Sequence, residues 1–248
     1  MESILETVNL SKNFGALQAV VDVNLKVTPG TIHSVIGPNG AGKTTLFNLL
    51  TGFLAPSSGR IAFGGRDITK FPAHKISRLG ISRSFQITSI FPELSVRENI
   101  RIAVQSRTNR SYHFLESLGQ KDGLAERSRE VLERIGLRDK EDLPAKNLSH
   151  GEKRILDIGI GLSTNPKLLL LDEPASGLVG DEIRRVTSLI EDISSHVTVI
   201  LVEHNIDVVL SISDRITVLY YGEVIAEGSP AEIRCDANVQ EVYLGITC

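Results

Sequence analysis

Nine consecutive residues have the types and spacing of a phosphate-binding loop: Gly37, Pro38, Asn39, Gly40, Ala41, Gly42, Lys43, Thr44 and Thr45. Glycine tolerates backbone conformations that a Cβ would block, so successive N–H groups can converge on one anion. Lys43 would place its charge on the outer phosphates of a nucleotide, and the Thr44 hydroxyl would bind Mg²⁺. An apolar run precedes the loop and a helical pattern follows it, which disfavours a turn that binds nothing. The sequence therefore predicts a site for ATP or GTP.

Two acidic residues end a strongly apolar segment. Leu168 to Leu171 predicts a buried strand, and Asp172 and Glu173 follow it directly. The carboxyl edge of a parallel sheet is where such folds bind ligands. We expect Asp172 to bind Mg²⁺ and Glu173, which points the other way, to act as general base for an attacking water. Without the phosphate loop, two surface acids at a strand end would be the ordinary interpretation.

Three single residues carry weaker signals. His204 follows a second buried strand, 197–202, and could hold the γ-phosphate or orient the water. Gln86 ends an extended segment and could ligate Mg²⁺ or contact a water. Phe14 lies in a predicted loop, 11–16, where its ring could stack on a nucleotide base. A structural histidine, a surface glutamine and a core phenylalanine are the alternatives, because residue chemistry alone does not choose between them.

A second helix start in the chain can also bind an anion. Ser149 would cap this helix, and His150, Gly151 and Glu152 would form its first turn. A plain N-cap is the ordinary interpretation. The alternative gains weight because the chain then has two helix starts that can hold phosphate, in different parts of the molecule.

Apolar periodicity places these residues in an α/β fold. Buried strands are predicted at 32–36, 167–172 and 197–202, a strand at 4–10, a half-exposed strand at 20–27, and hairpins at 60–68 and 215–227. Helices are predicted at 42–50, 72–79, 95–105, 126–135, 151–162, 180–194 and 206–213. We expect one domain over 1–248, with a catalytic core and β subdomain from 1–87 and 164–248. Residues 88–163 would form an inserted helical subdomain.

Bulk composition excludes several classes of protein. With 248 residues, 41% of them apolar and 23% charged, the chain is typical of ordinary globular proteins. The formal net charge of −3 argues against a nucleic-acid partner. No apolar run reaches the length of a membrane span, and the N-terminus lacks the pattern of a secretory signal. Cys235 and Cys248 lack metal-ligand spacing, and both are expected to be structural or incidental thiols in a reducing cytosol.

Taken together, the motifs resemble the nucleotide-binding subunits of ABC transporters. The resemblance follows the chain in order: aromatic loop (Phe14), phosphate loop (37–44), glutamine loop (Gln86), signature (148–152), acid strand (168–173) and switch histidine (His204). It implies a P-loop NTPase (RecA-like) core with an antiparallel β subdomain and an inserted α-helical subdomain, acting as an ATPase with ATP and Mg²⁺. More narrowly, segments such as Arg83-Ser84-Phe85-Gln86 resemble the ATP-binding subunits of branched-chain amino-acid importers. Importers of urea or other amides in the same subfamily share these segments.

The resemblance also implies a set of partners. Two cassettes, identical or related, would pack head to tail, with each ATP between Lys43 of one chain and Ser149 and Gly151 of the other. A groove near Gln86 would receive a short helix from each membrane-spanning permease subunit. An extracytoplasmic solute-binding protein would act indirectly, and the chain would be peripheral on the cytoplasmic face of the inner membrane. A soluble ABC ATPase acting on ribosomes or DNA, and a non-hydrolysing nucleotide switch, are the alternatives.

Two departures from the family pattern stand out. The usual signature is Leu-Ser-Gly-Gly-Gln, and here His150 and Glu152 replace a glycine and the glutamine. Ser149 and Gly151, which would approach the phosphate, are kept, so we expect activity. Val179 stands where a polar residue is usual, which puts a contact across the dimer in doubt.

Overall fold

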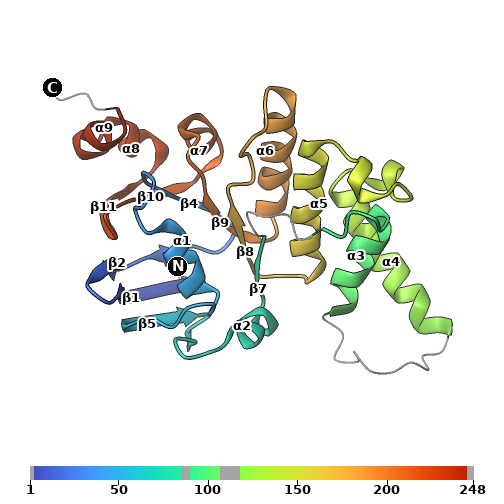
Figure 1. Cartoon of the computed structure of the whole chain (residues 1–248), viewed down its shortest axis with the longest axis horizontal. Coiled ribbons are helices and arrows are strands. Elements are labelled where there is room, and N and C mark those ends of the chain that lie inside the picture. The colour runs from blue at the N-terminus through green and yellow to red at the C-terminus, as the bar shows by residue number, and fades with distance from the viewer. Residues whose placement is uncertain (1–2, 85–89, 107–117, 245–248) are drawn as a thin grey trace.

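The computed structural model describes residues 3–84, 90–106 and 118–244 (Figure 1). Its strands are β1 (Leu5–Phe14), β2 (Leu17–Val23), β3 (Lys26–Val27), β4 (Ile32–Ile36), β5 (Ser58–Phe63), β6 (Arg66–Asp67), β7 (Ile81–Arg83), β8 (Leu168–Asp172), β9 (Thr198–Val202), β10 (Arg215–Tyr220) and β11 (Glu223–Gly228). Its α-helices are α1 (Lys43–Leu50), α2 (Ala73–Leu79), α3 (Val96–Ser106), α4 (Leu118–Arg134), α5 (His150–Ser163), α6 (Asp181–Ser194), α7 (Ile206–Ile212), α8 (Pro230–Cys235) and α9 (Ala237–Leu244). Short 3-10 helices cover Arg138–Lys140 and Ala145–Asn147.

The larger sheet positions the site. Its strand order is β11-β10-β4-β9-β8-β7, and the pairs are parallel except for the β10–β11 hairpin. Strands β4, β9 and β8 are direct neighbours, so their carboxyl ends meet at one edge. The phosphate loop follows β4, the acid pair ends β8, and His204 follows β9. The sheet therefore gathers the three strongest sequence signals.

Strand β8 is apolar from Leu168 to Leu171 because both of its faces are covered. Along β8, Leu168 and Leu170 pack into one core cluster, and Leu169 and Leu171 pack into another. The first cluster contains α1 and the antiparallel strands, and the second contains α3 to α6. Burial on two faces explains a strand sequence without polar alternation.

The smaller sheet has the order β2-β1-β5-β6, with β3 also paired to β1. It lies on the α1 side of the core, away from α3 to α5 (Figure 1). One local prediction is wrong here: Phe14 is not in a loop but is the last residue of β1, paired with Leu17 in a tight hairpin. The predicted strand 20–27 is also interrupted, because β2 ends at Val23 and β3 begins at Lys26.

The helical region lies at the far end of the molecule from α8 and α9 (Figure 1). Ser95 directly precedes helix α3, and the carboxylate of Glu98 in the first turn accepts from the Ser95 N–H at 2.9 Å. Helix α4 is longer than the predicted 126–135, and α9 was not predicted. The α/β fold with helices and two sheets is confirmed, whereas the subdomain boundaries stay a prediction. Gln86 lies outside the described residues.

Candidate nucleotide-binding and hydrolysis site

The phosphate loop runs from the buried strand β4 into α1. Gly42 is the N-cap of α1 with φ of 102°, and no side chain of the described residues caps this helix. A Cβ on Gly42 would lie 2.3 Å from the Ala19 carbonyl oxygen of β2, so glycine is required by both conformation and space. The first-turn N–H groups of an uncapped helix, together with its dipole, suit an anion.

Lys43 is buried against its own loop. Its Nζ donates hydrogen bonds to the carbonyl oxygens of Gly37 at 2.6 Å and Pro38 at 3.0 Å. Burial lowers the pKa of Lys43 below its usual value, and the nearby carboxylates of Glu173 and Asp172 oppose that shift. The ammonium therefore lies close to both acids of the β8 end, in the position to compensate phosphate charge.

Asp172 ends β8 as a buried carboxylate with a buried partner. Arg83 Nη2 of β7 donates to Asp172 Oδ2 at 2.7 Å, and Arg83 Nη1 donates to Asn48 Oδ1 of α1 at 2.6 Å. Arg83 also lies over the Phe47 ring, 5.5 Å from its centroid. The arginine thus joins β7, β8 and α1 beneath the phosphate loop. This role of Arg83 could not be predicted from the sequence, because its partners Asn48 and Asp172 lie 35 and 89 residues away along the chain.

The donor set near Lys43 fits Mg²⁺. This ion prefers oxygen ligands and keeps several waters, so one carboxylate and one hydroxyl beside nucleotide phosphates suffice. Asp172 offers the carboxylate, and Thr44 offers an exposed hydroxyl in the first turn of α1. Within the described ranges, no group of three or more His, Cys, Asp or Glu could hold a metal on its own.

Glu173 and His204 face each other across the β8 and β9 ends. His204 Nδ1 lies 3.3 Å from Glu173 Oε1, and the exposed fractions of the two side chains are 47% and 15%. Glu173 adopts a left-handed backbone conformation with φ of 52°, and its N–H donates to Val202 O at 2.8 Å. A strained residue that follows a buried strand is typical of functional sites. A carboxylate that can accept a proton and an imidazole that can orient a water are therefore adjacent.

The second helix start is built differently. Ser149 caps α5 in a capping box, because its Oγ accepts from the Glu152 N–H and its own N–H donates to Glu152 Oε2. The Gly151 N–H donates to Glu182 Oε1 of α6 at 3.2 Å. Lys140 Nζ donates to Glu152 Oε1. Partial burial raises the pKa of Glu152, but the bonds from Lys140 and Ser149 outweigh that effect and lower it.

The two departures in the signature have structural partners. Glu152 closes the capping box described above, which a glutamine could also do. His150 lies against the loop that follows β8, since a Cβ on Gly177 would be 3.3 Å from His150 Nε2. Val179 in that loop is 74% exposed. This surface, formed by the α5 start and the loop 176–180, is therefore polar in part and carries one exposed valine.

The remaining predicted residues surround the loop. Thr45 is half-buried in α1, and Asn39 and Gly40 are exposed at the tip of the phosphate loop. Phe14 is 46% exposed at the tip of the β1–β2 hairpin, with Lys12 Nζ 5.2 Å from its ring centroid. Strand β2 of this hairpin passes the loop at Ala19, as noted above. The structure thus places the aromatic residue on an element that borders the phosphate loop.

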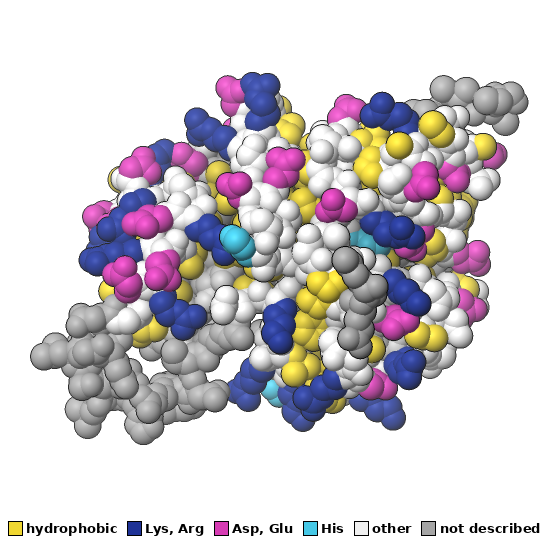
Figure 2. Space-filling model, turned by 180° about the vertical axis from the view of Figure 1, so that it is seen from behind, with side chains coloured by type: hydrophobic (Ala, Val, Ile, Leu, Met, Phe, Trp, Pro, Cys, Tyr) yellow, Lys and Arg dark blue, Asp and Glu magenta, His cyan; other side chains and the backbone are white. Residues whose placement is uncertain are grey.

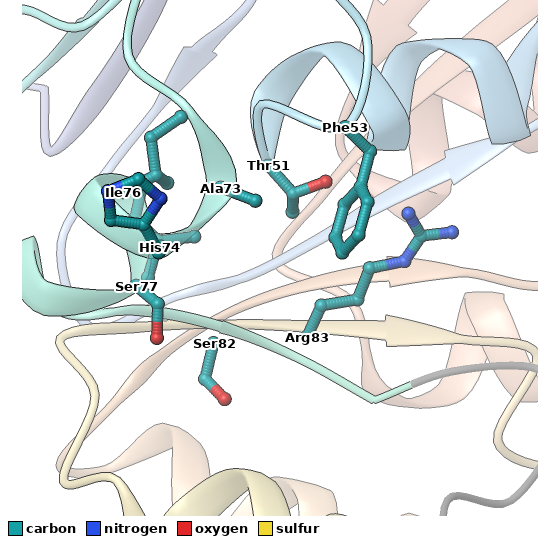
Figure 3. Close-up of a pocket in the computed structure, with 9 residues that line it drawn as sticks. Thr51, Phe53, Ala73, His74, Ile76, Ser77, Ser82 and Arg83 are labelled. Atoms are coloured by element: carbon teal, nitrogen blue, oxygen red, sulfur yellow. The ribbon is translucent and has the colours of Figure 1, made fainter. Parts of the chain in front are cut away.

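A pocket of about 270 Å³ lies on another side of α1, at the end of β7. Figure 3 shows the Phe53 ring over the Arg83 side chain, facing His74 and Ser77 of α2. Phe53 is 55% exposed. Strand β7 forms part of its lining through Ile81, Ser82 and Arg83. The pocket therefore combines an exposed aromatic ring with the arginine that contacts Asp172.

Comparison with known proteins gives the family. Residues 20–176 match the family model described as ABC transporter, and residues 223–246 match a second model, branched-chain amino acid ATP-binding cassette transporter. The chain is similar to two solved ATP-binding cassettes of ABC transporters, each 31% identical. The one in the ADP conformation has a TM-score of 0.88 and covers 99% of this chain and all of the other. The nucleotide-free one has a TM-score of 0.84 and covers 98% and 100%.

The chain belongs to the ABC transporter family of ATP-binding cassettes, and it is an ATPase. Among curated proteins it is 41% identical to the branched-chain amino acid transport ATP-binding protein BraF of Pseudomonas aeruginosa and 39% identical to LivG of Escherichia coli. Each alignment covers 98% of both proteins. The predicted family resemblance, fold class and ATPase activity are confirmed.

ATP-binding subunits of this family dimerise and work with membrane permeases. In the described parts of this chain, no helix could cross a membrane.

Proposed function

We propose that the chain is the ATP-hydrolysing subunit of an importer for branched-chain amino acids. The solute class rests on the match of residues 223–246 to the family model for branched-chain amino acid transporters. The full-length relatives BraF and LivG are transport ATP-binding proteins for the same class of solute. Importers of urea or amides within the same subfamily are the alternative. Permeases and a solute-binding protein would select the solute, so this chain supplies energy rather than specificity.

The proposed site uses one cluster of groups for binding and another for hydrolysis. The N–H groups of the uncapped α1 start bind the phosphates, and Lys43 leaves its loop carbonyls to compensate their charge. Thr44 and Asp172 would hold Mg²⁺, which supplies further charge stabilisation when bound; Gln86 is proposed as a third ligand. Glu173 accepts the proton of the attacking water, and His204 holds the γ-phosphate or orients that water. Phe14 stacks on the adenine.

The second cassette completes the site in this proposal. Ser149 and Gly151 at the α5 start would contact the γ-phosphate bound to the partner's loop, flanked by His150 and Glu152. A phosphate gripped from both chains gives ATP a higher affinity for the closed pair than for the open one, which shifts the population toward closure. Hydrolysis removes that grip and reopens the pair. The partner cassette would be identical or a related chain.

The permease would dock at the pocket beside α2. Phe53 offers an exposed ring. Strand β7 lines the pocket and ends at Arg83, which bonds to Asp172. On the rear face, Lys and Arg side chains gather along the lower edge beside a stripe of hydrophobic side chains (Figure 2). A short amphipathic helix of a permease fits such a groove. The chain would then lie peripherally on the cytoplasmic face of the membrane, without contact to nucleic acid.

Replacing Glu173 tests the assignment of the base. Glu173→Gln removes the proton acceptor but keeps the shape, so turnover should fall by about 10²-fold or more while ATP binding persists. The variant should accumulate an ATP-bound dimer, detected by gel filtration with and without ATP. Glu191→Gln, an exposed acid on α6, is the control. Wild-type turnover in Glu173→Gln would show that Glu173 is not the base.

Co-purification and uptake test the transport role. The chain should bring membrane permeases with it, and the purified assembly in vesicles should take up leucine, isoleucine or valine with ATP inside. Uptake of urea in place of these amino acids would move the chain to the alternative solute. Recovery of ribosomes or DNA instead of permeases would overturn the transport role.

A further inference from the structure

Glu203 is a buried acid that the proposed chemistry does not use. It follows β9 directly, precedes His204 and is 1% exposed. A carboxylate removed from water is costly unless hydrogen bonds replace its hydration. Its partners therefore indicate why an acid stands at this position.

The Glu203 carboxylate accepts backbone hydrogen bonds from two different loops. Its Oε1 accepts from the Ala175 N–H at 2.7 Å, and its Oε2 accepts from the His204 N–H at 3.2 Å. Burial raises the pKa of Glu203, and these N–H groups oppose the shift. One side chain thus ties the loop after β8 to the loop after β9.

Both loops carry a residue of the reactive pair. Ala175 lies two residues after Glu173, and His204 adjoins Glu203 in sequence. The 3.3 Å contact between Glu173 and His204 needs a fixed spacing of these loops. Two further interactions hold this spacing beyond the end of β8: the Glu173 N–H donates to Val202 O, and the Glu203 carboxylate accepts from the Ala175 N–H. The backbone bond would survive a change at position 203, but the side-chain tie would not.

We propose that Glu203 is a positioning residue for ATP hydrolysis, whose carboxylate holds the two loops so that His204 and Glu173 meet. This inference rests on the roles proposed above for Glu173 and His204. A structural acid that only stabilises the end of β9 would have the same burial, so the test must separate position from stability.

The experiment is a double-mutant cycle between positions 203 and 204 in the full chain with its permease. We measure kcat and KM for ATP, and the Kd of ATP, for Glu203→Gln, Glu203→Ala, His204→Ala and the double variants. Glu203→Ala should lower kcat by about 10- to 100-fold and leave the Kd of ATP within about threefold. Adding it to His204→Ala should cost less than about twofold more, because residues that act as a unit are not additive.

Two further variants secure the interpretation. Glu203→Gln keeps the shape and one acceptor oxygen, so it should fold and recover part of the kcat lost in Glu203→Ala. Thr198→Val is the matched control: Thr198 is also buried on β9 and also accepts a backbone bond, from Gly30 at 3.0 Å, but at the opposite end of the strand. It should lower stability and leave kcat unchanged.

Three outcomes would overturn the proposal. The first is a double variant in which the separate losses of kcat multiply, and the second is a kcat equal to wild type in both Glu203→Gln and Glu203→Ala. The third is a loss of kcat in Thr198→Val as large as that in Glu203→Ala. Failure of the underlying assignments is visible separately, because wild-type kcat in Glu173→Gln or in His204→Ala would refute those roles without involving position 203.

Discussion

The two helix starts that are proposed to grip one nucleotide are built in opposite ways. The α1 start is capped by a glycine in a left-handed conformation, carries no side-chain cap among the described residues and has Lys43 beside it. The α5 start is closed by a capping box, and two acids, Glu152 and Glu182, accept from its N–H groups.

This difference in capping indicates different roles for the two helix starts: the α1 start suits phosphate binding within one chain, and the α5 start suits completion of a site on a second chain. The α1 start has N–H groups and a cation ready for an anion, so it can bind phosphate within one chain. The α5 start is already satisfied by carboxylates of its own chain, and an incoming phosphate has to compete with Glu182 for the Gly151 N–H. With the roles proposed above, the first half-site would determine the affinity for the nucleotide, and the second would determine whether the bound nucleotide joins two chains.

The largest expected effect is at Lys43. Lys43→Ala removes the buried cation of the α1 start, so both ATP affinity and turnover should fall by about 10²–10³-fold. Lys140→Ala, which removes a cation from the α5 start, is the matched control and should leave ATP affinity of the single chain unchanged. Fluorescent-nucleotide titration measures both. Equal losses in the two variants would break the distinction between the half-sites.

Glycine-to-alanine changes test the two starts by stability. At Gly42 a Cβ would meet the Ala19 carbonyl at 2.3 Å with φ of 102°, and backbone cannot give way. Gly42→Ala should lower the free energy of unfolding by about 3 kcal/mol or more. At Gly151 the nearest atoms are Cβ, Cγ and Cδ of Glu182 at 3.1 Å, which have to move by only a few tenths of an ångström, so Gly151→Ala should cost about 1 kcal/mol or less. Urea unfolding compares the two, and a similar loss in both would contradict the structure.

Acid should destabilise the fold through the strand that leads into the phosphate loop. Burial, and then the charge of Arg215, lower the pKa of His33 on β4 from 6.5 to about 4. The unfolded chain therefore takes up a proton at a higher pH than the folded one. The contribution of neutral His33 to the free energy of unfolding is therefore complete above pH 6.5 and is lost as the pH falls from about 6.5 toward 4. The loss is about 2 kcal/mol at pH 5 and about 3 kcal/mol in all.

The measurement is the free energy of unfolding in urea at pH 7.5 and pH 5. His33→Asn should remove about 2 kcal/mol of the difference between the two pH values. His196→Asn, at an exposed position, should retain it. An unchanged pH dependence in His33→Asn would show that the buried imidazole is not the group responsible.

The smallest effect concerns Glu182, and it has opposite signs in two measurements. Glu182→Gln weakens a charge interaction at the α5 start, so stability should fall by about 0.3–1 kcal/mol. The same change removes a negative charge that competes with phosphate, so ATP-driven association of Glu173→Gln chains should tighten by about two- to fivefold. Unfolding and analytical ultracentrifugation measure these. Weaker association would mean that Glu182 supports the second half-site instead of competing for it.

Local chemistry explains which parts of the fold could be predicted from the sequence. The phosphate loop, the buried strands β4, β8 and β9 and the cap at Ser149 depend on glycine conformation, two-sided burial and side-chain-to-backbone bonds within a few residues. Each of these signals is complete in a short stretch of chain. The order of β4, β9 and β8 then follows from the family fold rather than from any one segment.

Contacts between distant segments explain what could not be predicted. Phe14 was expected in a loop, but the antiparallel pairing of β1 with β2 extends that strand to Phe14. The bonds Arg83–Asp172, Gly151–Glu182 and Ala175–Glu203 join residues 89, 31 and 28 positions apart. Nothing in a local pattern shows that such groups will meet, because the fold brings them together only after the sheet has formed.

The long sequence separation within the central sheet has a consequence for synthesis of the protein. Strand β4 lies between β9 and β10, and Gly30 just before it bonds to Thr198, 168 residues further along. At ~5–20 residues per second, a ribosome completes β9 roughly 10–30 s after β4 emerges. During that time the β1–β2 hairpin can form alone, whereas the five residues of β4 have no neighbouring strand of the larger sheet with which to pair. The strand that carries the phosphate loop thus stays unpaired until β9 or β10 has been made, and its apolar side chains are exposed to association with other chains during that time.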